Sequence, residues 1–93
     1  MSKVDIHKSI CLRMNEIYAK KNSDYGDSFA KTREVVPGAI LVRLHDKLSR
    51  LDSLLMDPSN QKVKDESIND TLLDLANYCV MELVERDLED DMK

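Results

Sequence analysis

Residues 39–55 read AILVRLHDKLSRLDSLL, and leucine recurs along this stretch at alternating spacings of three and four. The five positions are Leu41, Leu44, Leu48, Leu51 and Leu55. This alternation keeps the leucines on one side of a helix, as in the seam of a coiled coil. The stretch therefore predicts a helix over about 39–56, which the run Asp57-Pro58-Ser59-Asn60 should end.

Apolar side chains follow a helical period on both sides of this stretch. Before it, the pattern predicts a helix over about 4–21, with Ile6, Ile10, Met14 and Ile17 on one stripe. After it, the pattern predicts a helix over about 66–88, with Ile68, Leu72, Leu75, Cys79 and Leu83 on one stripe. The second half of that last helix is apolar on most sides, so we expect it to pack against two or more neighbours. We expect the acidic tail, about 88–93, to fray.

With a short helical turn near 28–34, these helices predict an all-α fold, a helical bundle forming one domain over residues 1–93. The composition agrees, because 42% hydrophobic and 34% charged residues with two Gly and two Pro are typical of a helical protein. A chain of 93 residues buries only about two thirds of the surface that it exposes when unfolded. The core of one chain should therefore be modest, and we expect a homo-oligomer.

Charge and hydropathy exclude several classes of partner. The net charge is -4 and no basic tract is longer than two residues, which disfavours binding to duplex nucleic acid. No apolar run approaches the roughly 18 residues of a membrane span. The N-terminal sequence MSKVDIHKSI lacks the apolar block and cleavage site of a secretion signal, so we expect a cytoplasmic protein that does not bind membranes.

The two cysteines, Cys11 and Cys79, lie inside predicted helices and have no CxxC or His-rich companion. This spacing supports neither a zinc site nor a redox motif. We expect both thiols to be buried.

An acidic stripe on the third main helix requires explanation. Glu66, Asp70, Asp74 and Asn77 fall at i, i+4, i+8 and i+11, within a sector about 80° wide. Like charges at this spacing destabilise a helix unless cations offset them. The 39–56 helix offers groups of both signs beside its seam, namely Arg43, Asp46, Lys47 and Arg50. Two interpretations stay open: salt bridges between helices, or a site for Mg²⁺, which prefers carboxylate oxygens and phosphates.

The segment KNSDYGDS at residues 21–28 should interrupt the helical pattern, because Asn, Ser, Asp and Gly favour turns. Asp24, Gly26, Asp27 and Ser28 could serve only to cap the neighbouring helices. Alternatively, Tyr25 could meet a base while Lys20, Lys21 and Lys31 meet a phosphate, with the glycine allowing close approach of the backbone.

Three blocks in this order, KNSDYGDSF, AILVRLHDKLSRLDSLL and KVKDESINDTLLDLANYCVMEL, resemble the family called nucleotide modification associated domain, type one. The resemblance covers about residues 18 to 84, and the family occurs in phages and bacteria. Its name implies a link to nucleotide or DNA-base metabolism. The family is in turn similar to the larger MazG-type all-α nucleoside triphosphate pyrophosphohydrolases, in which acids on two adjacent helices hold Mg²⁺ and water attacks the α–β phosphate linkage.

This resemblance implies a nucleotide-binding protein with a pocket formed by the 24–28 turn, the 43–47 face and the acidic stripe. As a Mg²⁺-dependent pyrophosphohydrolase, it would hold metal with Asp46, Glu66 and Asp70 and would orient or deprotonate water with Asp74. The MazG-type Glu-x-x-Glu pair is replaced by Asp46 alone. The implied substrate-binding residues are Lys21, Asp24, Tyr25, Gly26, Arg43, Lys47, Arg50 and Asn77.

Two alternatives belong to other functional classes. A non-catalytic protein could sequester a nucleotide or a nucleotide-derived signal in the host cytoplasm if a phage encodes it. Such a protein needs stacking and phosphate pairing but no activated water. A purely structural bundle would use the same charges for salt bridges alone.

Overall fold

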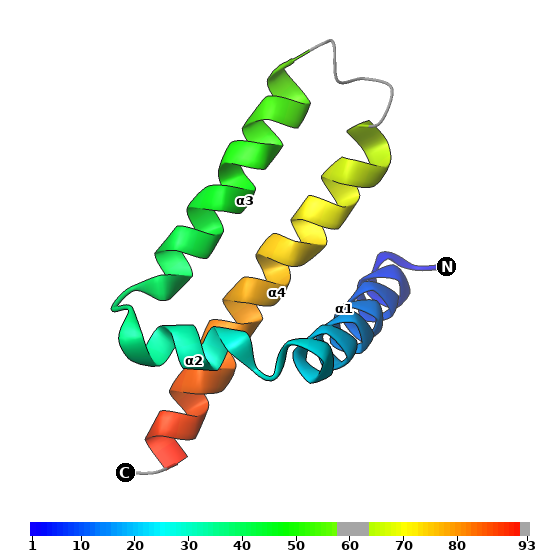
Figure 1. The fold of residues 1–93 in the computed structure, drawn as a ribbon. Helices are drawn as coiled ribbons and strands as arrows, with labels where there is room; N and C mark the ends of the chain where they lie inside the picture. Colours follow the sequence, from blue (N-terminus) through cyan, green and yellow to red (C-terminus); the bar gives the residue numbers. More distant parts are fainter. Residues whose placement is uncertain (58–63, 92–93) are drawn as a thin grey trace.

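The computed structural model describes residues 1–57 and 64–91, with the side chains of 64–66 left aside. The described residues form four α-helices (Figure 1). Their bounds are α1 Lys3–Tyr25, α2 Ser28–Val35, α3 Ala39–Met56 and α4 Lys64–Asp91. The predicted all-α fold is confirmed, and the helix predicted over 39–56 matches α3 at both ends.

The helices α3 and α4 run antiparallel and make the most extensive helix pair of the molecule (Figure 1). Only part of the leucine seam faces α4, because Leu44 and Leu51 are half-buried whereas Leu41, Leu48 and Leu55 are exposed. Leu54, one residue from the predicted seam, is the buried leucine of α3. In the hairpin of α3 and α4, one edge of the leucine seam therefore packs against α4, and the other edge is exposed.

The helix α1 continues four residues past its predicted end at Lys21, so the predicted break over KNSDYGDS is wrong for its first half. Gly26 takes a left-handed conformation with φ 60° and donates its N–H to the carbonyl of Asn22. Asp27 donates to the same carbonyl at 3.2 Å. Asn, Ser and Asp cost only a few tenths of a kcal/mol each inside a helix, whereas a left-handed glycine ends one. The helix therefore stops at Gly26.

Replacing Gly26 with alanine is expected to destabilise the fold by about 1–2 kcal/mol, the cost of a left-handed conformation for a residue with a Cβ. The cost is conformational, because the added Cβ would meet only the Lys31 ammonium at 3.7 Å. Urea unfolding followed by circular dichroism measures it. As control, Ser23→Ala changes an exposed residue of the same helix and should leave stability within about 0.5 kcal/mol. Equal stability of Gly26→Ala and wild type would contradict this account of the helix end.

The ion-pair network around Arg33 ties α2 to the C-terminal half of α4. The Arg33 guanidinium donates from Nε to Glu82 Oε1 and from Nη2 to Glu82 Oε2, both at 3.0 Å, and it also pairs with Glu89. Arg86 Nε donates to Glu82 Oε2 at 2.8 Å. The helix α4 extends to Asp91, three residues beyond its predicted end. The predicted fraying of the tail, about 88–93, stays a prediction, and residues 92–93 lie outside the described part.

This network should make the docking of α2 sensitive to acid. Hydrogen bonds from Arg33 hold the pKa of both Glu82 and Glu89 below the ordinary value of 4.5. A depressed carboxyl pKa stabilises the fold above the unfolded value and loses that contribution as the pH falls through the folded value. We therefore expect the Tm to fall below about pH 4.5 by more in wild type than in Arg33→Met. Parallel pH profiles of the two proteins in thermal melts would exclude this role.

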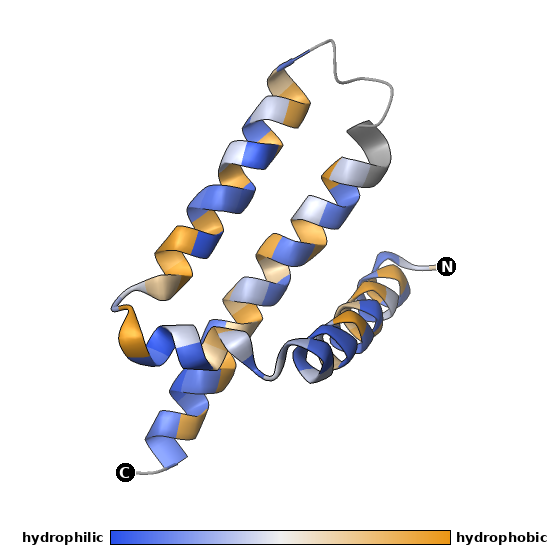
Figure 2. Ribbon diagram, in the orientation of Figure 1, coloured by the Kyte–Doolittle hydropathy of each residue, from blue (hydrophilic) through white to orange (hydrophobic). Residues whose placement is uncertain are grey.

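Few apolar side chains are buried in one copy of the chain. Among the described residues, the buried apolar ones are Phe29, Ala39 and Leu54, whereas many apolar residues of α1, α3 and α4 are exposed. Figure 2 shows hydrophobic residues recurring along these helices. Cys11 and Cys79 are both exposed, so their predicted burial is wrong for the single chain. None of the helices in the described ranges combines the length and apolar character of a membrane span.

Candidate functional site

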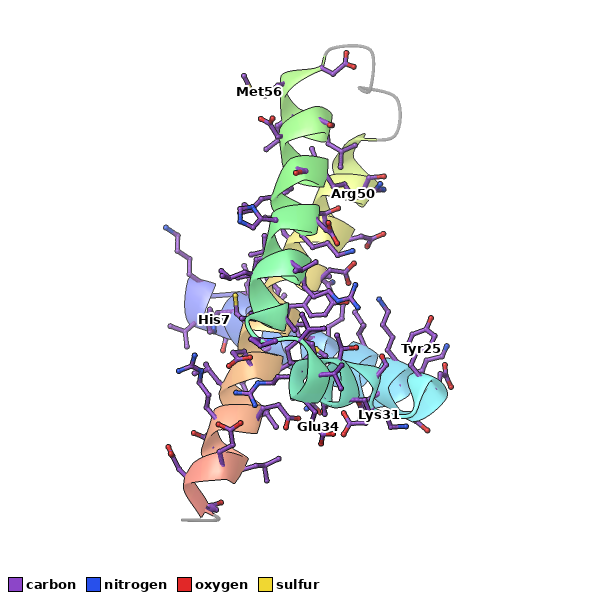
Figure 3. All side chains as sticks on the ribbon, turned by 60° about the vertical axis from the view of Figure 1, so that its left-hand side comes forward. His7, Tyr25, Lys31, Glu34, Arg50 and Met56 are labelled. Atoms are coloured by element: carbon purple, nitrogen blue, oxygen red, sulfur yellow. The ribbon has the colours of Figure 1, made fainter. Side chains whose placement is uncertain are left out.

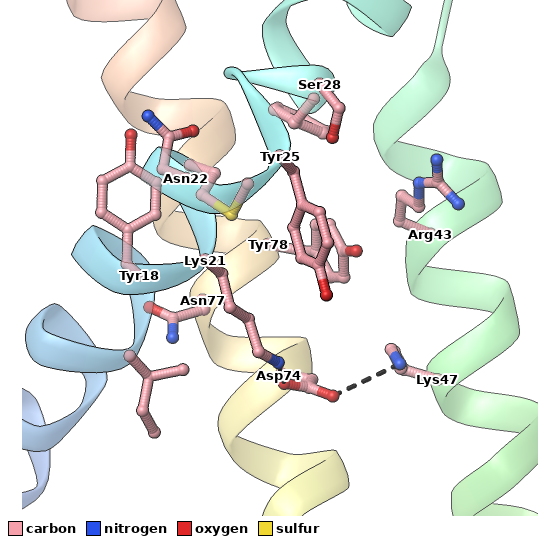
Figure 4. Close-up of a pocket in the computed structure, with 13 residues that line it drawn as sticks. Tyr18, Lys21, Asn22, Tyr25, Ser28, Arg43, Lys47, Asp74, Asn77 and Tyr78 are labelled. Atoms are coloured by element: carbon pink, nitrogen blue, oxygen red, sulfur yellow. Dashed lines mark hydrogen bonds and ion pairs between the residues drawn. The ribbon is translucent and has the colours of Figure 1, made fainter.

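A cavity of about 160 Å³ opens where the end of α1, the start of α2, the first half of α3 and the middle of α4 meet (Figure 4). Its apolar lining is Ile17, Phe29 and Met81, and its aromatic lining adds Tyr18, Tyr25 and Tyr78. Its other lining residues are Lys21, Asn22, Ser28, Arg43, Lys47, Asp74 and Asn77. Four segments distant in sequence therefore contribute to one site.

Cationic side chains outnumber carboxylates on the walls of this cavity. Asp74 is the one carboxylate among the described lining residues, and it receives Lys21 Nζ on Oδ1 and Lys47 Nζ on Oδ2, each at 3.3 Å. Arg43 lines the same wall as Lys47, one helical turn away, and makes no ion pair within the described part of the chain. The site carries three formal positive charges against one negative charge, in a protein of net charge -4.

Tyr25 lies at the mouth of the cavity. It is the last residue of α1 and projects where α1 turns into α2, near Lys31 (Figure 3). Its side chain is 68% exposed, so it does not pack in the core. The aromatic floor is formed instead by Phe29 and Tyr78, whose ring centroids lie 5.9 Å apart at 53°. Tyr25 therefore presents a largely exposed ring beside the cations.

Two further lining residues, Asn77 and Tyr18, come from α4 and α1. Asn77 is buried, and its Nδ2 donates to the backbone carbonyl of Met14 at 3.2 Å, which fastens α1 to α4. The pKa of Tyr18 is raised, chiefly by burial and then by the nearby charges of Asp27 and Glu85. The Tyr18 phenol therefore stays protonated and can donate a hydrogen bond.

The structure brings together six of the residues that the sequence proposed for a site. Lys21, Tyr25, Arg43, Lys47, Asp74 and Asn77 all line the cavity. Arg50 lies outside it, farther along α3, where its Nε donates to Thr71 Oγ1 at 3.2 Å (Figure 3). Asp24 and Gly26 do not line it either, and Gly26 instead ends α1.

The predicted metal ligands do not gather at the cavity within the described residues. Asp46 and Asp70 are exposed and are not among its lining residues, and the side chain of Glu66 lies outside the described part. In the described ranges no group of three or more His, Cys, Asp and Glu side chains is suited to hold a metal ion. A Mg²⁺ site built on Asp46, Glu66 and Asp70 stays a prediction.

The tyrosines Tyr18 and Tyr78 were missed by the sequence reasoning. Tyr18, Lys21, Asn22 and Tyr25 follow the helical spacings of three and four, and this signal becomes visible only when the helix is continued to Tyr25. Tyr78 follows Asp74 by four residues on α4 and so belongs to the same face of that helix.

The fold and this cavity define an all-α protein with a cation-rich, tyrosine-lined pocket. The sequence profile of nucleotide modification associated domain 1 matches residues 21–85, most of the chain and all of the cavity lining except Ile17 and Tyr18. The chain belongs to this family. No curated protein and no solved structure matches it.

Proposed function

We propose that the protein binds a nucleotide in this cavity, with phosphates against Lys21, Arg43 and Lys47 and the base against Tyr25. The observation that carries the proposal is the convergence of three cations from two helices beside an exposed aromatic ring. The membership in a nucleotide-associated family supports it.

The cations of the cavity have N–H donors available for a phosphate. Each lysine ammonium has three donors, and its contact with Asp74 at 3.3 Å is longer than the roughly 2.7–2.9 Å of a strong charge-assisted bond. The Arg43 guanidinium offers a planar fork that suits two phosphate oxygens. The lysines and Arg43 can therefore donate hydrogen bonds to a phosphate without first breaking a strong ion pair.

The base end of the proposal rests on Tyr25. Stacking of a base on an exposed aromatic side chain contributes about 1–3 kcal/mol and tolerates different bases. The cavity of about 160 Å³ is smaller than the roughly 300–1,000 Å³ of typical small-molecule sites. It therefore encloses one end of a nucleotide, while the stacked base lies at the open mouth.

Binding without chemistry is favoured over hydrolysis by the state of Asp74. Both of its oxygens are paired with lysines, so this carboxylate positions cations and is poorly placed to take a proton from water. Such a protein would sequester its ligand, and a phage could use it against a nucleotide signal in the host cytoplasm. A Mg²⁺-dependent nucleoside triphosphate pyrophosphohydrolase is the second candidate, because Asp70 precedes Asp74 by one helical turn and could supply a further carboxylate near the phosphates.

Calorimetry and product analysis test the two candidates together. The purified protein is titrated with nucleoside triphosphates, cyclic nucleotides and ADP-ribose-type nucleotides, with Mg²⁺ and with a chelator, and each mixture is assayed for pyrophosphate. We expect binding of at least one class in chelator and recovery of the ligand unchanged. Pyrophosphate release that needs Mg²⁺ would establish the hydrolase instead. Failure of every class to bind at millimolar concentration would overturn the proposal.

Replacing Asp74 with asparagine separates the two roles of this residue. If Asp74 only holds the lysines, the change releases them, and nucleotide affinity should rise several-fold. If Asp74 activates water, turnover should be lost. Asp87→Asn is the matched control, because it removes the same charge from an exposed position of the same helix outside the cavity lining. Weaker binding by a folded Asp74→Asn protein, with Asp87→Asn unchanged, would show that Asp74 aids phosphate binding instead of competing with it.

A further inference from the structure

The hairpin of α3 and α4 carries an apolar face that is exposed in the described part of the chain. On α3, Leu41, Leu48 and Leu55 recur every seven residues and are 60%, 54% and 63% exposed. On α4, Leu72 and Leu83 are 48% and 58% exposed and share a stripe with Ala76 and the exposed Cys79. The α4 spacings are four, three and four, so each stripe has the period of a helix–helix seam.

Both stripes lie on the same side of the hairpin. On α3, Lys47 faces the cavity and Leu51 faces α4. Leu48 and Leu55 lie farther around the helix in the same direction, about 80–100° from Lys47. On α4, Asp74 faces the cavity and Thr71 faces Arg50 of α3. The apolar stripe of α4 lies farther around the helix in the same direction, about 140–180° from Asp74. Because the two helices are antiparallel, these rotations have opposite senses in space and bring both stripes to the side away from the cavity. We call this surface the leucine face.

The exposed area of the chain shows that a large surface is unpartnered. The accessible area is 7339 Å². A compact monomer of 10.7 kDa exposes only about 5,500 Å². The radius of gyration of 15.3 Å likewise exceeds the roughly 12 Å of a compact 93-residue domain. This excess over the whole chain, roughly 1,800 Å², is larger than the about 800 Å² that one partner contributes to a standard interface.

We infer that a second copy of this chain docks on the leucine face and that the two hairpins form a four-helix bundle. A two-fold axis places the same surface on both sides of the contact, and seams with spacings of three and four interlock at the shallow crossing angle of such bundles. The core that one chain lacks is then built between two chains. The cavities remain on the outer sides of the dimer, so the inference does not rest on nucleotide binding.

Mass measurement with matched variants tests the interface. Wild type should sediment or elute at twice the 10.7 kDa of one chain at micromolar concentration. Leu48→Glu should lower the dimer population by at least tenfold, because it would place a charge inside the seam. Val42→Glu is the matched control on the same helix, since Val42 is 53% exposed but points away from α4. A wild-type monomer, or a dimer that Leu48→Glu and Val42→Glu affect equally, would overturn the inference.

The thiols supply a second measurement that needs no disruptive variant. In Cys11→Ser, the remaining Cys79 lies on the leucine face, and in Cys79→Ser the remaining Cys11 lies on α1. In the dimer, maleimide should modify Cys79 about tenfold or more slowly than Cys11, since burial suppresses thiol reactivity. Fast, equal reaction of both thiols in proteins of native helix content would overturn the inference, even if Leu48→Glu failed to fold.

Discussion

Nucleotide binding is expected to weaken about ten- to a hundredfold when Arg43 or Lys47 is replaced with alanine. Hydrogen bonds to charged groups contribute roughly 1.5–3 kcal/mol each, and about 1.4 kcal/mol corresponds to a tenfold change in Kd. Both side chains line the cavity, and both are half-buried, which limits screening by solvent. Calorimetric titration of each variant with the tightest nucleotide found for wild type gives the change directly.

Arg50→Ala is the matched control for this experiment. Arg50 lies on the same helix with the same charge but donates to Thr71 outside the cavity, so its loss should change Kd less than about threefold. Raising the salt concentration should weaken wild-type binding more steeply than binding by Arg43→Ala, since one phosphate contact is already lost. An Arg50→Ala protein as impaired as Arg43→Ala would mean that the ligand lies farther along α3.

Phe29→Ala is expected to cost about 3–5 kcal/mol of stability, the usual loss for a buried phenylalanine. Phe29 is 5% exposed and packs against Tyr78, and it is one of the few buried apolar side chains among the described residues. Because it joins α2 to α4 beneath the cavity, its loss should also widen the site. Urea unfolding at matched protein concentration measures the change, since association would shift apparent stability.

Val35→Ala is the control for Phe29→Ala. Val35 is on the same helix and is 77% exposed, so truncating it should change stability by no more than about 0.5 kcal/mol. A loss under about 1 kcal/mol for Phe29→Ala would show that α2 contributes little to the packing of α4.

Local patterns predicted the helices well where the signal is periodic. The bounds of α3 follow from its leucine period and from Gly38 and Asp57 at its ends. The end of α1 was misjudged because Asn22, Ser23 and Asp24 are weak helix formers in isolation. The left-handed Gly26 ends the helix instead, because the small helix propensities of these three residues do not stop it earlier.

The site was harder to predict than the fold. A helical period places Asp70, Asp74 and Asn77 on one sector, but that sector spans both the cavity wall and its solvent-exposed border. Asp74 faces the lysines, Asn77 is buried under α1, and Asp70 is exposed. The rotation of each helix against its neighbours decides among these positions, and sequence spacing alone does not give it.

The exposure of Cys79 was not predicted for a similar reason. An apolar stripe indicates that something covers it, but spacing alone does not distinguish a neighbour in the same chain from one in another chain. The expectation of burial came from the pattern of α4, whereas the single chain leaves that face open.

The paired contacts of Asp74 have a consequence for binding kinetics. Lysines from α1 and α3 already converge on one anion at equal distances of 3.3 Å. An incoming phosphate would exchange with that carboxylate, and little rotamer freedom would have to be surrendered at that moment. Such preorganisation lowers the entropic cost of association and favours rapid capture over slow induced closure.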